Sequence, residues 1–134
     1  MKLYRSAALV LAASFLLVGA LFLAVPDRVI SFFNRLSAPL GLPEGPPVGH
    51  SFFLILASGY MYLVSLLAWL MYKHPRKRTF PFILAHGKSA SSLLSLLFFL
   101  TQKPYLIYLV NFLVDGVIAA GVWRMCRTCR TEIR

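Results

Sequence analysis

Long apolar blocks alternate with short polar segments along the chain. Each block has close to the roughly 20 residues that an α-helix needs to cross a hydrocarbon core of about 30 Å. The pattern predicts membrane-spanning helices over residues 6–25, 51–72, 82–100 and 105–123. We therefore expect an all-α integral membrane protein, a four-helix bundle that forms a single membrane domain over residues 1–134.

The first block, after Lys2 and Arg5, has the charge and hydrophobicity of a secretory signal peptide. However, its apolar run is longer than the usual stretch of about 7 to 15 residues, and no small-x-small cleavage site follows it. We expect it to be retained as a membrane span.

A shorter amphipathic pattern separates the first two blocks, over residues 27–37. Val29, Phe32, Phe33 and Leu36 recur with helical spacing, and polar residues occupy the other side. The pattern predicts a short helix that lies at the outer membrane interface, anchored by Phe32 and Phe33.

The segment 38–50 that follows contains four prolines and three glycines. This composition predicts a shaped loop without regular structure. Two interpretations remain open, a tether that anchors the first helix and a lid or docking surface for an extracytoplasmic partner.

Composition agrees with a membrane protein. Of the 134 residues, 59% are hydrophobic and only 13% are charged, and the mean hydropathy is +0.74. A soluble core of this size would leave much of that apolar surface in water. The spans also occupy most of the chain, so we expect no separate soluble domain.

The basic residues predict the orientation. Three lie on one side of the predicted spans, at Arg28, Arg35 and Lys103. The opposite side carries Lys2, Arg5, Lys73, Arg76, Lys77, Arg78, Arg124, Arg127, Arg130 and Arg134. The positive-inside rule then places both termini, including the basic tail 124–134, in the cytoplasm. Contact with anionic lipid headgroups accounts for the net charge of +10, so we expect membrane lipids and no nucleic acid as partners.

Two charges of opposite sign fall inside the predicted spans. Lys88 lies roughly 9 to 12 Å from the cytoplasmic end of the third span, and Asp115 roughly 12 Å from that of the fourth, at about 1.5 Å per residue. A charge near the bilayer centre costs about 2.5 to 3.5 kcal/mol and usually has a partner. Because short connections make these helices antiparallel neighbours, we predict a direct or water-bridged pair.

Other polar residues follow the two charges at helical spacing. Ser91, Ser92 and Ser95 share the face of Lys88, whereas His86 points almost the opposite way. The fourth span adds Tyr108 and Asn111 to the face of Asp115. The second span carries a stripe of Ser58, Tyr62, Ser65 and Trp69.

We expect these three stripes to converge on one internal site. Its role stays open between fixing helix register and handling a proton, ion or ligand.

The sequence contains no complete motif for a conventional cofactor. Cys126 and Cys129 form a CxxC in the basic tail that would suit redox chemistry or half of a zinc site, but these are the only two cysteines. We expect ordinary thiols there, with redox or metal function as the alternative. His50, His74 and His86 fall at different depths, so a two-histidine haem site is not expected. We predict no cofactor and no metal.

Two sequence segments resemble a known family. The turn "YKHPRKRTFPF" before the third span, and "VNFLVDGVIAAGVW" with Asp115, are similar to the small four-helix bacterial membrane proteins grouped as DoxX-like, mainly over the last two thirds of the chain. Some of these are membrane subunits of quinone-linked oxidoreductases. The resemblance implies an inner-membrane accessory subunit and transfers no catalytic residue.

The leading hypothesis is a non-catalytic subunit that assembles with other integral membrane subunits, or with itself, in a larger complex, for which a respiratory or quinone-linked oxidoreductase is a candidate. Small residues spaced four apart, at Ala8 and Ala12 and at Gly116 and Ala120, suit helix contacts inside or between chains. The alternative is a small transporter, or a quinone- or lipid-binding protein, whose polar cavity contains Lys88 and Asp115. A stand-alone enzyme is not expected, since no nucleophile with its base is apparent.

Overall fold

The computed structural model describes residues 2–46 and 52–131. Within these ranges the chain is helical and contains no strand. Its helices are α1 (Lys2–Ala24), α2 (Pro26–Ser37), the short 3₁₀ helix η1 (Ala38–Leu40), α3 (Phe52–Lys73), α4 (Thr79–Thr101) and α5 (Leu106–Thr131). The helices α1, α3, α4 and α5 are each long and apolar enough to cross a membrane, which supports the predicted class of multi-pass membrane protein.

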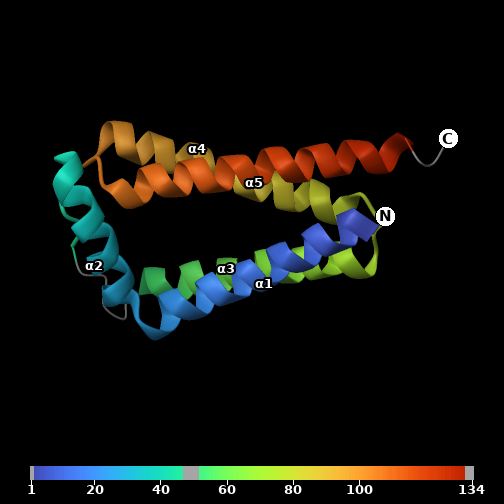
Figure 1. The fold of residues 1–134 in the computed structure, drawn as a ribbon, viewed down its shortest axis with the longest axis horizontal. Coiled ribbons are helices and arrows are strands. Elements are labelled where there is room, and N and C mark those ends of the chain that lie inside the picture. The colour runs from blue at the N-terminus through green and yellow to red at the C-terminus, as the bar shows by residue number, and fades with distance from the viewer. Residues whose placement is uncertain (1, 47–51, 132–134) are drawn as a thin grey trace.

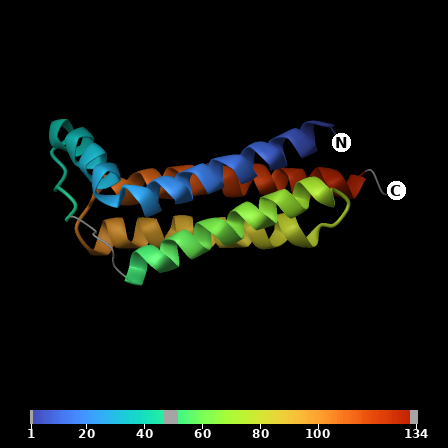
Figure 2. The ribbon, with the colours of Figure 1, turned by 90° about the horizontal axis from the view of Figure 1, so that it is seen from below.

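The long helices form two closely packed pairs. α1 packs along α3, and α4 packs along α5, whereas α3 and α4 share a smaller contact. Figure 1 shows the pairs as two arms that diverge from the turn between α3 and α4, with both termini at that end. α2 lies across the open end and contacts α5, and Figure 2 shows the four long helices running alongside one another.

Three helix ends lie three or more residues from the predicted span ends. α1 begins at Lys2 instead of residue 6. α4 begins at Thr79 instead of residue 82, because Pro81 lies in its first turn, where a missing backbone N–H leaves no helical hydrogen bond unmade. α5 continues to Thr131, through the first part of the predicted basic tail. Hydrophobicity marks where a span can end, but the Arg and Met residues that follow Trp123 are good helix formers.

The hydrophobic core fills the half of the molecule nearer the termini. Its side chains come from the first half of α1, the last turns of α3, the start of α4 and the end of α5, and they are Tyr4, Ala8, Ala12, Phe15, Val64, Ala68, Met71, Leu84, Ala85 and Val122. Small residues allow α1 and α3 to approach closely. A Cβ atom on Gly19 would lie 2.8 Å from Cβ of Met61, and Ser65 Oγ donates a hydrogen bond of 2.7 Å to the carbonyl of Ala12.

α2 is the predicted amphipathic helix, with Pro26 at its first position. Ile30 is buried, whereas Phe32 remains exposed. The segment after α2 folds back on it, because the Asn34 side chain donates to the carbonyl of Gly45 at 2.9 Å and accepts from its N–H at 2.8 Å.

The expectation that segment 38–50 has no regular structure was wrong at its start. Ala38–Leu40 form a 3₁₀ turn that ends at Gly41, whose φ of 64° is left-handed and favours glycine. Pro39 fits such a turn, since its fixed φ is helical. Residues 47–50, including His50, lie outside the described residues.

Candidate functional site

Lys88 on α4 and Asp115 on α5 form a buried ion pair. Lys88 Nζ lies 2.8 Å from Asp115 Oδ1, and the two side chains are 3% and 5% exposed. The predicted contact is therefore present and direct. Burial of both charges removes them from water, so each depends on the other for electrostatic stabilisation.

Aromatic rings from the other arm complete the surroundings of the lysine. Lys88 Nζ lies 4.6 Å from the ring centroid of Phe15 on α1 and 5.3 Å from that of Tyr60 on α3. The negative face of an aromatic ring attracts a cation most strongly where water is excluded. All four long helices thus contribute to the environment of one ammonium group.

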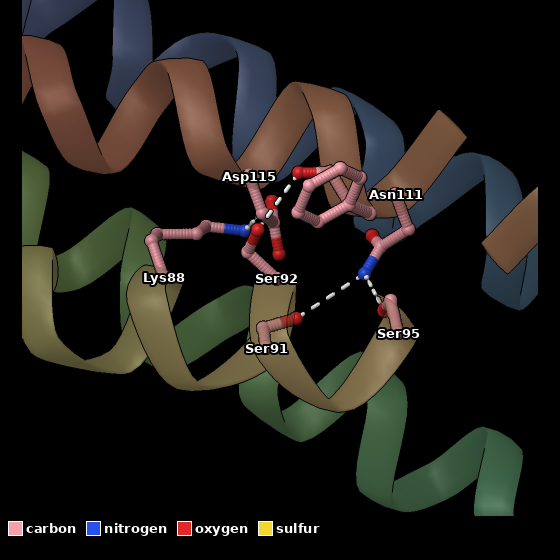
Figure 3. A network of polar contacts seen from close by, with 7 residues as sticks. Lys88, Ser91, Ser92, Ser95, Asn111 and Asp115 are labelled. Carbon is pink, nitrogen blue, oxygen red and sulfur yellow. Dashed lines mark hydrogen bonds and ion pairs between the residues drawn. The ribbon is translucent and has the colours of Figure 1, made fainter. Parts of the chain in front are cut away.

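A ladder of hydrogen bonds continues from the ion pair along α4 and α5 (Figure 3). The Asn111 amide donates to Ser95 Oγ at 2.6 Å and to Ser91 Oγ at 3.3 Å. Ser92 Oγ donates to the carbonyl of Phe112 at 2.8 Å. These bonds, together with the ion pair, connect α4 to α5.

The predicted stripes of α4 and α5 meet, with one partial exception. Lys88, Ser92, Ser95 and Asp115 are buried, and Ser91 and Asn111 are half-buried beside them. Tyr108 instead joins an aromatic cluster, with its ring 6.0 Å from that of Phe98 and 5.6 Å from that of Tyr105.

The prediction that the stripe of α3 also converges there was wrong. Tyr62 is 64% exposed and Trp69 is exposed too. Ser65 is buried but bonds to α1, and Ser58 Oγ is buried without a hydrogen-bond partner among the described residues. α3 presents Tyr60 to the site instead, on the same face as the core residues Val64, Ala68 and Met71. Tyr60 precedes Val64, Ala68 and Met71 by four, eight and eleven residues, which places all four on one face of α3.

A cavity of about 390 Å³ adjoins the ion pair. Most of its wall is apolar, and most of its polar side chains come from α4 and α5. All four long helices line it, through Leu11, Ser14, Phe15, Val18, Phe22, Ala57, Tyr60, Met61, Lys88, Ser91, Asn111, Val114, Asp115 and Ile118. It begins where the packed core ends, because the two arms diverge there.

The other candidate residues lie away from this cavity. His86 is exposed, with Nδ1 2.9 Å from the carbonyl of Phe82 and its ring 5.0 Å from that of Trp123, so it points away from Lys88 as predicted. Cys126 is buried, with Sγ 3.9 Å from a guanidinium nitrogen of Arg78. The side chain of Cys129 lies outside the described residues, so the CxxC hypothesis stays a prediction.

No model of a known family, no curated protein and no solved structure matches this chain. The similarity to DoxX-like proteins thus stays a prediction from two sequence segments.

Proposed function

We propose that this protein binds a small amphipathic molecule dissolved in the bilayer, a quinone or a lipid, in the cavity beside Lys88 and Asp115. The observation that supports this most is the composition of the cavity wall, which is apolar over most of its area and has a few charged and amide groups at one place. Ligand sites in proteins have this character and volumes of about 300 to 1,000 Å³.

The polar groups suit the head of such a molecule. Lys88 has three N–H donors, of which one bonds to Asp115, and the Asn111 amide lies on the same wall. A carbonyl oxygen on the ligand would accept from the remaining Lys88 donors, and its apolar part would lie against Phe15, Met61 and Ile118. An ionisable pair inside a membrane segment commonly marks a substrate or proton pathway.

The packing of the helices would allow a ligand to enter the cavity from the lipid. Among the described residues α1 and α5 have hardly any direct contact, and both line the cavity. Val18 on α1 and Val114 on α5 belong to its wall and remain 40% and 50% exposed. A ligand would therefore enter sideways between α1 and α5, without crossing a polar loop.

The accessory-subunit hypothesis is the second candidate. The Lys88–Asp115 pair supports this hypothesis, because a pair that fixes the register of α4 and α5 also fixes how their outer faces meet a partner. The small residues spaced four apart give this hypothesis less support. Ala8 and Ala12 are buried in the core. Gly116 lies close to Ser92, since a Cβ atom added to Gly116 would lie 3.2 Å from Ser92 Oγ. The proposed orientation, with both termini in the cytoplasm of a bacterial cell, applies to both candidates and rests on the basic residues.

Cavity filling tests the ligand-binding function. Val114→Phe places a ring in the cavity wall, whereas Val117→Phe makes the same change on the outward face of α5. Binding of short-tailed quinones and of fatty acids to the purified protein should weaken at least tenfold in Val114→Phe and remain at the wild-type level in Val117→Phe. Equal binding by both variants would exclude the cavity as the site.

Native purification separates the two candidates. If the protein is an accessory subunit, mild detergent should recover stoichiometric partner subunits, and neither cavity variant should change their recovery. Isolation without partners, together with saturable ligand binding, would support the cavity function.

A further inference from the structure

A second cavity, of about 460 Å³, lies at the end of the molecule that carries the termini. Arg5 of α1, Lys73 at the end of α3, and the turn residues 74–77 line it. The four formally charged residues among them, Arg5, Lys73, Arg76 and Lys77, are all basic. Such a concave cluster attracts an anion more strongly than the same charges spread over a flat surface.

No carboxylate of the described residues neutralises this cluster. Asp27 and Glu44 belong to α2 and the segment after it, at the opposite end of the molecule (Figure 1), and Asp115 is paired with Lys88. The cluster has Arg78 next to it in the chain, which adds a further positive charge. Within the part of the chain that the structure describes, its positive potential is therefore available to a ligand.

Aromatic residues hold two of the basic side chains in place. The Arg5 guanidinium carbon lies 5.7 Å from the ring centroid of Tyr72, and Lys73 Nζ lies 5.4 Å from that of Trp69. Exposed tryptophan and tyrosine rings at helix ends are typical of the boundary between hydrocarbon and headgroups. This places the cavity at the depth of lipid phosphates.

Apolar surface continues from the cavity along the helices. Leu3, two residues before Arg5 on α1, is 84% exposed, and Leu66, nearly one turn before Trp69 on α3, is exposed as well. A lipid whose phosphate sits among the basic residues could lay its acyl chains on such surfaces, whereas a free phosphate would gain nothing from them. The combination favours a lipid ligand.

We propose that the cavity lined by Arg5, Lys73, Arg76 and Lys77 binds the phosphate headgroup of an anionic phospholipid. Basic pockets at the ends of transmembrane helices recognise such headgroups through charge and hydrogen bonds. The proposal is independent of the Lys88–Asp115 cavity and of which leaflet the turn between α3 and α4 faces.

The test compares two double variants, each of which loses two positive charges. Arg76→Gln/Lys77→Gln removes two of the lining charges, and Arg28→Gln/Lys103→Gln removes two exposed charges outside the cavity. The full chain is placed in nanodiscs of phosphatidylcholine, with or without cardiolipin or phosphatidylglycerol. We expect the anionic lipids to raise the midpoint of thermal unfolding of the wild type and the control variant, and at least half of this shift to be lost in Arg76→Gln/Lys77→Gln.

Two outcomes would overturn the proposal. Equal shifts in both variants would mean general attraction of a basic protein to an anionic surface. An equal shift produced by inorganic phosphate or pyrophosphate in phosphatidylcholine discs would mean a site for free phosphate instead of lipid.

Fluorescence gives a test that leaves the cavity intact. In Trp123→Phe, Trp69 is the single remaining tryptophan. Phosphatidylglycerol with brominated acyl chains should quench Trp69 at least twice as strongly as brominated phosphatidylcholine at the same mole fraction. Equal quenching would contradict selective binding beside Lys73.

Discussion

Lys88 and Asp115 are separated by 27 residues in the chain, yet their charged atoms lie 2.8 Å apart inside the protein. The pair joins α4 to α5, and the rings of Phe15 and Tyr60 reach it from the other arm. Removal of either charge leaves the other buried without a counter-ion.

Neutralising one member of this pair should therefore destabilise the protein strongly. We expect Lys88→Met or Asp115→Asn to lower the free energy of unfolding by about 3 kcal/mol or more, measured by SDS titration in mixed micelles. The double variant Lys88→Met/Asp115→Leu removes both charges and should recover most of the loss. If the double variant is as unstable as the sum of the single variants, the two charges do not act as a pair.

The hydrogen bonds of Asn111 should contribute less to the stability of the protein than the ion pair does. Asn111→Ala removes two hydrogen bonds between α5 and α4, each worth about 0.6 kcal/mol in a membrane protein, so a loss of about 1 kcal/mol is expected in the same titration. Tyr62→Phe removes a hydroxyl from an exposed tyrosine and should change stability by less than about 0.5 kcal/mol. A comparable effect of both changes would contradict the assignment of Asn111 to the helix interface.

Gly19 should be intolerant of a side chain. Gly19→Ala forces its Cβ against Met61, and overpacking of this kind typically costs about 1 to 3 kcal/mol. Gly59→Ala is the matched control, since the added Cβ would meet no atom of another described element within 4 Å and alanine is the better helix former. Unfolding of the two variants side by side should show the first less stable than the wild type and the second at least as stable.

The contact of Asn34 with Gly45 should protect the segment after α2. Asn34→Ala removes both hydrogen bonds, so cleavage between residues 41 and 46 in limited proteolysis should become several-fold faster. Arg28→Ala on the same helix serves as the control and should be cleaved at the wild-type rate. No change in Asn34→Ala would mean that other contacts hold this segment against α2.

The sequence predicted the features that depend on local periodicity. The long helices follow from the apolar blocks, α2 from its amphipathic pattern, and the Lys88–Asp115 contact from matched depth on antiparallel neighbours. Two charges among apolar residues have few possible partners, so their pairing is strongly constrained.

The inward face of α3 could not be chosen by polarity. Lipid is as apolar as a protein core, so exposed tyrosine and tryptophan cost little on the outside of a membrane helix. Tyr62 and Trp69 face outward, and Tyr60 faces the site because Val64 and Ala68 pack into the core. The cavity follows from the angle between the two arms, which no local pattern encodes.

The uneven distribution of contacts has a mechanical consequence. Hydrogen bonds of Ser65, Ser92 and Asn111 join α1 to α3 and α4 to α5, whereas the two arms share the packed core near the turn between α3 and α4. A change in the angle between the arms would leave these bonds intact, but it would alter the packed core, the contacts of Lys88 with Phe15 and Tyr60, and the volume of the cavity between the arms. Each pair of helices is therefore held together by more contacts than hold the two pairs to each other, and α2 contacts both pairs at the open end.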